Sequence, residues 1–171
     1  MRSRTREMVL AALMSALAAL LSVFSIPAGP TALTLQTFSA ALAGYVLGGR
    51  TGCLAVIGYL MLGLCGLPVF SGMTGGPGVL LGPTGGFLLG FPAMAWLCGR
   101  GGKGPIAAAA GLGGLAVVYI IGTVWMAAAA GMSIGQAAAV GVVPFIVKDI
   151  LSVAGAYWLG KVVRRRIERF H

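Results

Sequence analysis

Lys148 and Asp149 are the only charged residues in the apolar stretch between residues 137 and 160. A charged side chain at the centre of a membrane helix costs about 2.5–3.5 kcal/mol, so such residues usually mark a substrate or ion site. Consecutive residues diverge by about 100° on a helix, which predicts that each charge finds a separate partner. The alternative is a self-neutralising pair that locks helix packing. Pro144 suits the first turn of a helix and places both charges near its start.

A glycine-rich stretch, Gly66 to Phe91, combines a loop with the start of a helix, which Gly82, Pro83, Gly85 and Gly86 are expected to loosen or break. Glycines allow close backbone approach and let N–H groups point at a polar ligand. The segment Phe70 to Gly78 has too much free polar backbone to cross lipid, so we predict that it covers a ligand. Gly85, Gly86 and Gly90 either take part in such a site or serve close helix packing, which membrane helices favour.

Small residues recur at helical spacing near the N-terminus. Ala11, Ser15 and Ala19 form one row, with Ala12 and Ala16 beside it. Such rows let a second helix approach closely. They indicate either packing within the chain's own bundle or docking of a partner protein.

The composition requires a membrane to surround the elements that carry these residues. The chain has 171 residues, of which 58% are hydrophobic and 9% charged, and its mean hydropathy is +0.99. A soluble domain carries about 25% charged residues. At about 20 residues per crossing, we predict one all-α membrane domain over residues 1–171 with six transmembrane helices. The predicted helices span about 8–26, 31–47, 52–67, 79–98, 105–130 and 137–163.

The net charge of +9 reflects membrane orientation and gives no indication of nucleic-acid binding. Eleven basic residues fall on one side of the predicted topology, where positive residues mark short cytoplasmic loops. These residues are Arg2, Arg4, Arg6, Arg50, Arg100, Lys103, Lys161, Arg164, Arg165, Arg166 and Arg169. The connections at Pro27–Pro30, Pro68–Gly78 and Gly131–Gln136 carry no charge. Both termini are therefore predicted to be cytoplasmic in a multi-pass protein of the cell membrane.

Several enzymatic motifs are missing from the sequence. The segment Gly99 to Gly104 has neither the glycine spacing nor the Ser or Thr of a nucleotide-binding P-loop. The sequence contains no HExxH or GxSxG motif and no zinc spacing of Cys and His, so we expect no enzyme, metal or cofactor. Two other function classes stay open: a self-sufficient proton-coupled carrier in which Asp149 titrates, and an intramembrane enzyme.

Four runs of sequence together resemble a known family. They are LTLQTFSAALAGYVLGGRTG (33–52), YLMLGLCGLPVFSG (59–72), VLLGPTGGFLLGF (79–91) and PFIVKDI (144–150). In this order they are similar to BioY, the biotin-binding S component of energy-coupling factor (ECF) transporters, over nearly the whole chain. The resemblance implies six helices with both termini inside and capture of biotin from outside a prokaryotic cell.

The resemblance also implies partners. Transport by such S components depends on a membrane T component and two cytoplasmic ATPases, which turn over ATP while the loaded S component reorients. An AxxxA pattern on the first helix meets the T component in S components generally, which points to Ala12 and Ala16. Two positions depart from the family. Phe87 stands where Tyr is frequent, and Ser152 stands where the family has its lysine, so we transfer that lysine's role to Lys148, one helical turn away.

Biotin combines a carboxylate tail with a ureido ring that donates and accepts hydrogen bonds. We expect Lys148 to pair with the carboxylate or the ureido oxygen and Asp149 to accept ureido N–H groups. The other expected ligand-binding residues comprise three that form neutral hydrogen bonds and three that pack on the ring. They are Thr34, Gln36 and Thr74 for the first role, and Tyr45, Phe70 and Phe87 for the second.

Overall fold

The computed structural model describes residues 2–28, 31–102 and 104–169. Gly29 and Pro30 of the predicted tight connection, and Lys103 of the predicted basic loop, lie outside the described residues. Within the described part, the elements are α1 (Arg2–Val23), β1 (Ser25–Ala28), β2 (Thr31–Thr34), α2 (Gln36–Leu47), α3 (Gly49–Leu64), the 3-10 turn η1 (Ser71–Met73), α4 (Pro77–Leu81), α5 (Gly85–Arg100), α6 (Pro105–Ala130), α7 (Ile134–Gly141) and α8 (Ile146–Arg169).

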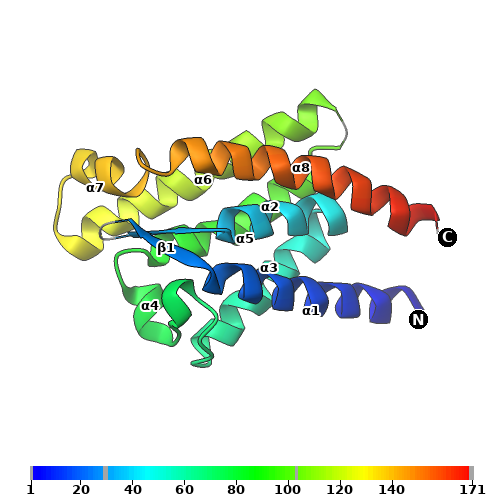
Figure 1. Ribbon diagram of the computed structural model, residues 1–171, viewed down its shortest axis with the longest axis horizontal. Coiled ribbons are helices and arrows are strands. Elements are labelled where there is room, and N and C mark those ends of the chain that lie inside the picture. The colour runs from blue at the N-terminus through cyan, green and yellow to red at the C-terminus, as the bar shows by residue number, and fades with distance from the viewer. Residues whose placement is uncertain (1, 29–30, 103, 170–171) are drawn as a thin grey trace.

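The long helices run along one axis of the molecule and form a bundle (Figure 1). Helix α5 packs against α6, α2 and α3, while α2 also packs against α8 and α1 against α3. Both termini lie at one end, and β1, α4 and α7 lie at the other (Figure 1). Two helices, Arg4–Val23 and Pro105–Ala130, are long and apolar enough to cross a membrane on their own, and α7 with α8 forms a bent third candidate.

The described part of the chain is mainly helical, as expected, but a β-hairpin replaces the start of the second predicted helix. Strands β1 and β2 pair antiparallel, with Ser25 opposite Thr34. Helix α2 begins only at Gln36, whereas a helix from residue 31 was expected. Pro27 and Pro30 lack the N–H group that a helix interior needs, which favours the extended connection. The hairpin places Thr34 directly before α2.

Two other predicted helices are broken. The segment predicted over 79–98 divides into α4 and α5, with Gly82 and Pro83 between them. The segment predicted over 137–163 divides into α7 and α8, which are bent by 56°. Pro144 lies in this break, two residues before α8, and not in the first turn of a helix as expected. A proline has no N–H to donate to the preceding turn, which explains a break at this place.

Small residues account for the closest helix contacts. A Cβ at Gly86 would collide with Trp125 of α6, and one at Gly90 would approach the Val118 backbone at 2.9 Å. These two glycines therefore serve helix packing. On α1, Ser15 is buried and donates a hydrogen bond to the Ala55 carbonyl of α3 at 2.6 Å.

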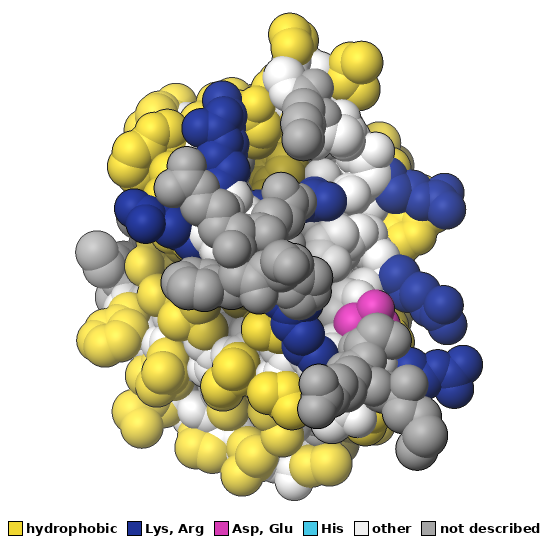
Figure 2. All heavy atoms as spheres, turned by 90° about the vertical axis from the view of Figure 1, so that its right-hand side faces the viewer, with side chains coloured by type: hydrophobic (Ala, Val, Ile, Leu, Met, Phe, Trp, Pro, Cys, Tyr) yellow, Lys and Arg dark blue, Asp and Glu magenta, His cyan; other side chains and the backbone are white. Residues whose placement is uncertain are grey.

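Basic side chains gather at the end of the bundle that holds the termini (Figure 2). The exposed basic residues of α1, α3, α5 and α8 at this end are Arg4, Arg6, Arg50, Arg100, Lys161, Arg164, Arg165 and Arg166. The opposite end contains the hairpin and the glycine-rich loop. The bundle thus has one basic end and one end that carries the polar features described next.

Candidate functional site

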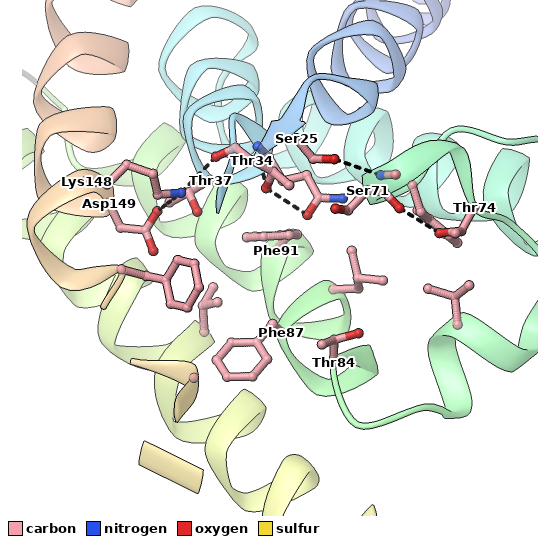
Figure 3. Close-up of a pocket in the computed structure, with 18 of the residues that line it drawn as sticks. Ser25, Thr34, Thr37, Ser71, Thr74, Thr84, Phe87, Phe91, Lys148 and Asp149 are labelled. Carbon is pink, nitrogen blue, oxygen red and sulfur yellow. Dashed lines mark hydrogen bonds and ion pairs between the residues drawn. The ribbon is translucent and has the colours of Figure 1, made fainter. Parts of the chain in front are cut away.

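A cavity of about 410 Å³ lies at the end of the bundle opposite the basic residues. Its volume falls within the range of about 300–1,000 Å³ that is usual for small-molecule sites. The hairpin, the loop around η1 and helices α2, α5, α6 and α8 all contribute to its wall (Figure 3). Polar lining residues are Ser25, Thr34, Gln36, Thr37, Ser71, Thr74, Thr84, Tyr119, Lys148 and Asp149.

Lys148 and Asp149 lie in the first turn of α8 and point into the cavity (Figure 3). The ammonium Nζ of Lys148 is 2.5 Å from Oδ1 of Asp149. The expectation that the two charges do not pair is therefore wrong, because the lysine side chain is long enough to fold back over its neighbour. Each residue nevertheless has a second partner. Lys148 Nζ donates to the Thr34 carbonyl at 2.8 Å and so connects α8 to the end of the hairpin.

The Asp149 carboxylate is buried, with 4% of the residue exposed. The Tyr119 hydroxyl of α6 donates to Oδ2 at 2.8 Å. Among the described residues, no donor reaches Oδ1 in hydrogen-bonding geometry, although Lys148 forms an ion pair with it. Buried carboxylate oxygens normally accept hydrogen bonds, and the ion pair with Lys148 takes that place at Oδ1. The N-terminal end of α8 also favours a negative charge at this place.

A second polar network lies at the start of α2. The Gln36 side chain donates from Nε2 to the Tyr59 hydroxyl at 2.9 Å and accepts from the Thr34 hydroxyl at 3.1 Å. These two contacts hold the amide between two hydroxyl groups, with its nitrogen at Tyr59 and its oxygen at Thr34. Thr37, one residue further on, also lines the cavity. The network thus holds one amide N–H of Gln36 at Tyr59 and leaves the second for another acceptor.

The loop around η1 is held against the hairpin and α3. The Gly72 N–H donates to the Ser25 hydroxyl at 3.0 Å, which connects the loop to β1. Gly72 has a φ of 69°, a left-handed conformation that favours glycine. Phe70 is 1% exposed and packs edge-on against Tyr59, with ring centroids 5.6 Å apart. A Cβ at Gly63 would collide with the Phe70 ring, so this glycine provides the space for the ring.

The apolar wall of the cavity is mainly aromatic. Phe87 and Phe91 of α5 face the cavity below the polar residues in Figure 3, and Phe145 lines it beside α8. Phe87 also packs against Gly122 of α6. An aromatic wall opposite a few polar anchors suits a ligand with an apolar ring and polar edges. Among the described residues, no three His, Cys, Asp or Glu side chains are grouped as metal ligands.

The structure brings together seven of the eight residues predicted to bind ligand. Those that line the cavity are Thr34, Gln36, Phe70, Thr74, Phe87, Lys148 and Asp149. Tyr45 is the exception. Its hydroxyl donates to the Ala107 carbonyl at 3.0 Å, and its ring packs against Tyr157 in the helix core. The prediction that Tyr45 packs on a ligand is therefore wrong.

Several cavity residues were not among those predicted from the sequence, and the aromatic ones are Tyr119, Phe91 and Phe145. The sequence does contain an indication for Tyr119, because it is the only tyrosine in the apolar segment Pro105–Ala130. A hydroxyl in such a segment needs a partner, and Asp149 is that partner. Phe91 and Phe145 had no signal that distinguishes them from ordinary helix-packing residues.

These features define a helical membrane protein with a small-molecule cavity at one end of its bundle, lined by a hairpin, a glycine-rich loop and a buried ion pair. The chain belongs to the BioY family, whose family model matches residues 1–169. This membership agrees with the resemblance in the four sequence runs.

Individual relatives match over most of their length. The chain is 42% identical over 153 residues to a probable biotin transporter BioY of Pyrococcus horikoshii, covering 90% of this chain and 93% of the relative. It is 40% identical over 155 residues to the biotin transporter BioY of Thermotoga maritima, covering 88% and 91%. A crystal structure of the S-component for biotin from an ECF-type ABC transporter superposes with a TM-score of 0.84 at 26% identity, covering 98% of this chain and 93% of that one.

Proposed function

We propose that the chain captures biotin with high affinity in this cavity and acts as the substrate-specific S component of an ECF-type transporter. The observation that carries the proposal is the buried Lys148–Asp149 pair, which lies in the cavity of a BioY family member. The transporter names of the relatives favour transport over enzymatic activity. The match to an S-component of an ECF-type ABC transporter disfavours a self-sufficient proton-coupled carrier that uses Asp149.

The ion pair is suited to the ureido ring of biotin. In a cyclic urea, an N–H donor lies directly beside the carbonyl acceptor. Oδ1 of Asp149 is an acceptor, and Lys148 Nζ, 2.5 Å from it, is a donor. The two groups together match the N–H and the carbonyl of the ureido ring. The carboxylate of biotin fits this place less well, because Asp149 would repel it.

The rest of the cavity provides neutral contacts. The free amide N–H of Gln36 and the hydroxyls of Thr34 and Thr74 lie along the polar wall. Phe70 and Phe87 offer ring faces for the apolar part of biotin. The site needs no metal or cofactor, since the ligand is carried and not transformed.

We also propose that the chain forms a single domain with six membrane crossings and cytoplasmic termini in a prokaryotic plasma membrane. The proposed crossings are built on the six described helices of 12 or more residues, which are α1, α2, α3, α5, α6 and α8. The basic end in Figure 2 supports the orientation, because positive residues concentrate on the cytoplasmic side. The cavity then faces outward. A T component and two cytoplasmic ATPases are the proposed partners for inward release of biotin.

A calorimetric titration of the purified protein tests the proposed function directly. We expect saturable binding of biotin with one ligand per chain and no binding of riboflavin or thiamine at the same concentrations. Equal binding of all three vitamins, or binding of either of the others in place of biotin, would show that the cavity serves another solute.

Valine at Gly63 is expected to lower biotin affinity through Phe70. The side chain would occupy the space of the Phe70 ring, and that ring lines the cavity. Overpacking typically costs 1–3 kcal/mol, which corresponds to an affinity loss of about 5- to 150-fold when the ring must return to bind ligand. Gly113→Val is the matched control, because nothing lies within 4 Å of its added Cβ. An equal affinity in both variants, measured by titration, would show that the position of Phe70 is unimportant.

A further inference from the structure

Tyr119 contacts the ion pair from a different helix. It lies on α6, lines the cavity and donates its hydroxyl hydrogen to Oδ2 of Asp149 at 2.8 Å. Helices α6 and α8 pack against each other, so this contact crosses an interhelical interface. Among the described residues, it is the only side-chain hydrogen bond to the carboxylate.

The contact determines how the carboxylate is turned. The terminal torsion of an aspartate is broad and has no sharply preferred value, so neighbouring groups set it. Lys148 reaches Oδ1 from the same helix, and Tyr119 holds Oδ2 from α6. With both oxygens held from two directions, Oδ1 stays at the cavity wall. Without Tyr119, only the flexible lysine side chain would restrain the carboxylate.

The contact also determines what Tyr119 offers to a ligand. A tyrosine hydroxyl has a single hydrogen to donate, and Asp149 takes it. The hydroxyl oxygen therefore presents only lone pairs to the cavity. The donor at this place is the Lys148 ammonium, whose Nζ lies 2.5 Å from Oδ1 of Asp149.

We propose that Tyr119 is a positioning residue that fixes the Asp149 carboxylate for ligand recognition. The inference rests on the proposed function, because the ureido ring of biotin provides N–H donors for the carboxylate. It adds to that function a residue on α6.

The first test measures the hydrogen bond without any ligand. The sequence has only three acidic side chains, Glu7, Asp149 and Glu168, so infrared carboxylate bands are few. Asp149→Asn identifies the band of Asp149 by its loss. We expect Tyr119→Phe to shift this band, because the carboxylate loses a hydrogen bond to one oxygen. An unshifted band would overturn the proposal, whether or not biotin binds.

The second test measures the consequence for binding. We expect Tyr119→Phe to weaken biotin binding by about tenfold, the scale of one hydrogen bond to a charged group. Tyr157→Phe is the matched control, since Tyr157 lies on α8 outside the cavity and packs against Tyr45. We expect it to leave both the infrared band and the affinity unchanged.

The two tests separate the inference from the proposed function. If wild-type protein binds no biotin, the proposed function fails, and the infrared band alone decides whether Tyr119 holds Asp149. If wild-type protein binds biotin and Tyr119→Phe binds it equally well, the positioning role is wrong while the function stands. If Tyr157→Phe lowers affinity as much as Tyr119→Phe, the effect reflects the loss of any hydroxyl in the bundle, and the positioning role is again wrong.

Discussion

Replacing Asp149 by Asn is expected to reduce biotin affinity by about 10- to 150-fold, since a hydrogen bond to a charged group contributes about 1.5–3 kcal/mol. The substitution keeps the size of the side chain but removes its charge. Lys148, whose side chain is 27% exposed, then has no counter-ion at the cavity wall. The new amide also brings two N–H donors to the place where ureido donors must bind. Both effects lower the affinity for biotin.

Equilibrium titration of purified variants measures this effect, and Glu7→Gln is its matched control. Glu7 is exposed at the basic end of the bundle, far along α1 from the cavity, so the same chemical change should have no effect there. Thermal unfolding of both variants verifies that the fold is retained. Wild-type affinity in a folded Asp149→Asn protein would remove Asp149 from the binding site.

The sequence predicted the cavity's charged residues well because membrane segments rarely contain such groups. Lys148 and Asp149 stood out in an apolar stretch, and both line the cavity. Their mutual contact was not predictable from helical spacing alone. Ideal helix geometry separates neighbours by about 100°, but it says nothing about where a long side chain folds. The contact of Lys148 with the Thr34 carbonyl depends on the hairpin, which the hydropathy pattern did not indicate.

The path of the backbone was harder to predict than the apolar segments. Hydropathy is similar in a straight helix and in a broken one, so the segments of α4 with α5 and of α7 with α8 were each predicted as one apolar crossing. Gly82 and Pro83 predicted the break within the first segment, whereas Pro144 was expected in the first turn of a helix and the break before α8 was not predicted. The hairpin before α2 was not predicted for the same reason, because hydropathy does not distinguish its strands from a helix.

Tyr45 shows why residue type alone is not enough. It lies nine residues after Gln36, about 13 Å along α2 at 1.5 Å per residue. Gln36 is at the cavity end of the helix, and Tyr45 is therefore more than two turns away toward the basic end. An aromatic residue in a membrane helix suits a ligand wall or a helix interface equally well. Only the packing of α2 against α8 assigns Tyr45 to the interface.

The small residues of α1 separate into two faces. Ser15 and Ala18 are buried, and Ser15 contacts the Ala55 carbonyl of α3. Ala12 and Ala16 are exposed one turn apart on the same helix. The first face is explained by packing within the bundle. Packing within the bundle does not explain the second face. A pair of small residues that face outward lets another helix approach closely.

Tryptophan at Ala12 or Ala16 is expected to reduce biotin uptake to the background level while leaving biotin affinity unchanged. The bulky ring would hold a helix of the proposed T component away from α1, whereas the cavity lies at the far end of the bundle and does not include either alanine. Uptake of labelled biotin by cells with the complete transporter measures the first quantity, and titration of the isolated chain measures the second.

Ile120→Trp is the matched control for these variants, because Ile120 is 65% exposed on α6 and its replacement likewise adds a ring to an outward-facing position. It should support normal uptake. Equal loss of uptake in all three variants would mean that tryptophan disturbs the bundle in the membrane. Normal uptake with Ala12→Trp and Ala16→Trp would show that the partner meets another face. Loss of uptake confined to α1, with affinity retained, would separate capture of biotin by the cavity from coupling to the ATPases through this helix.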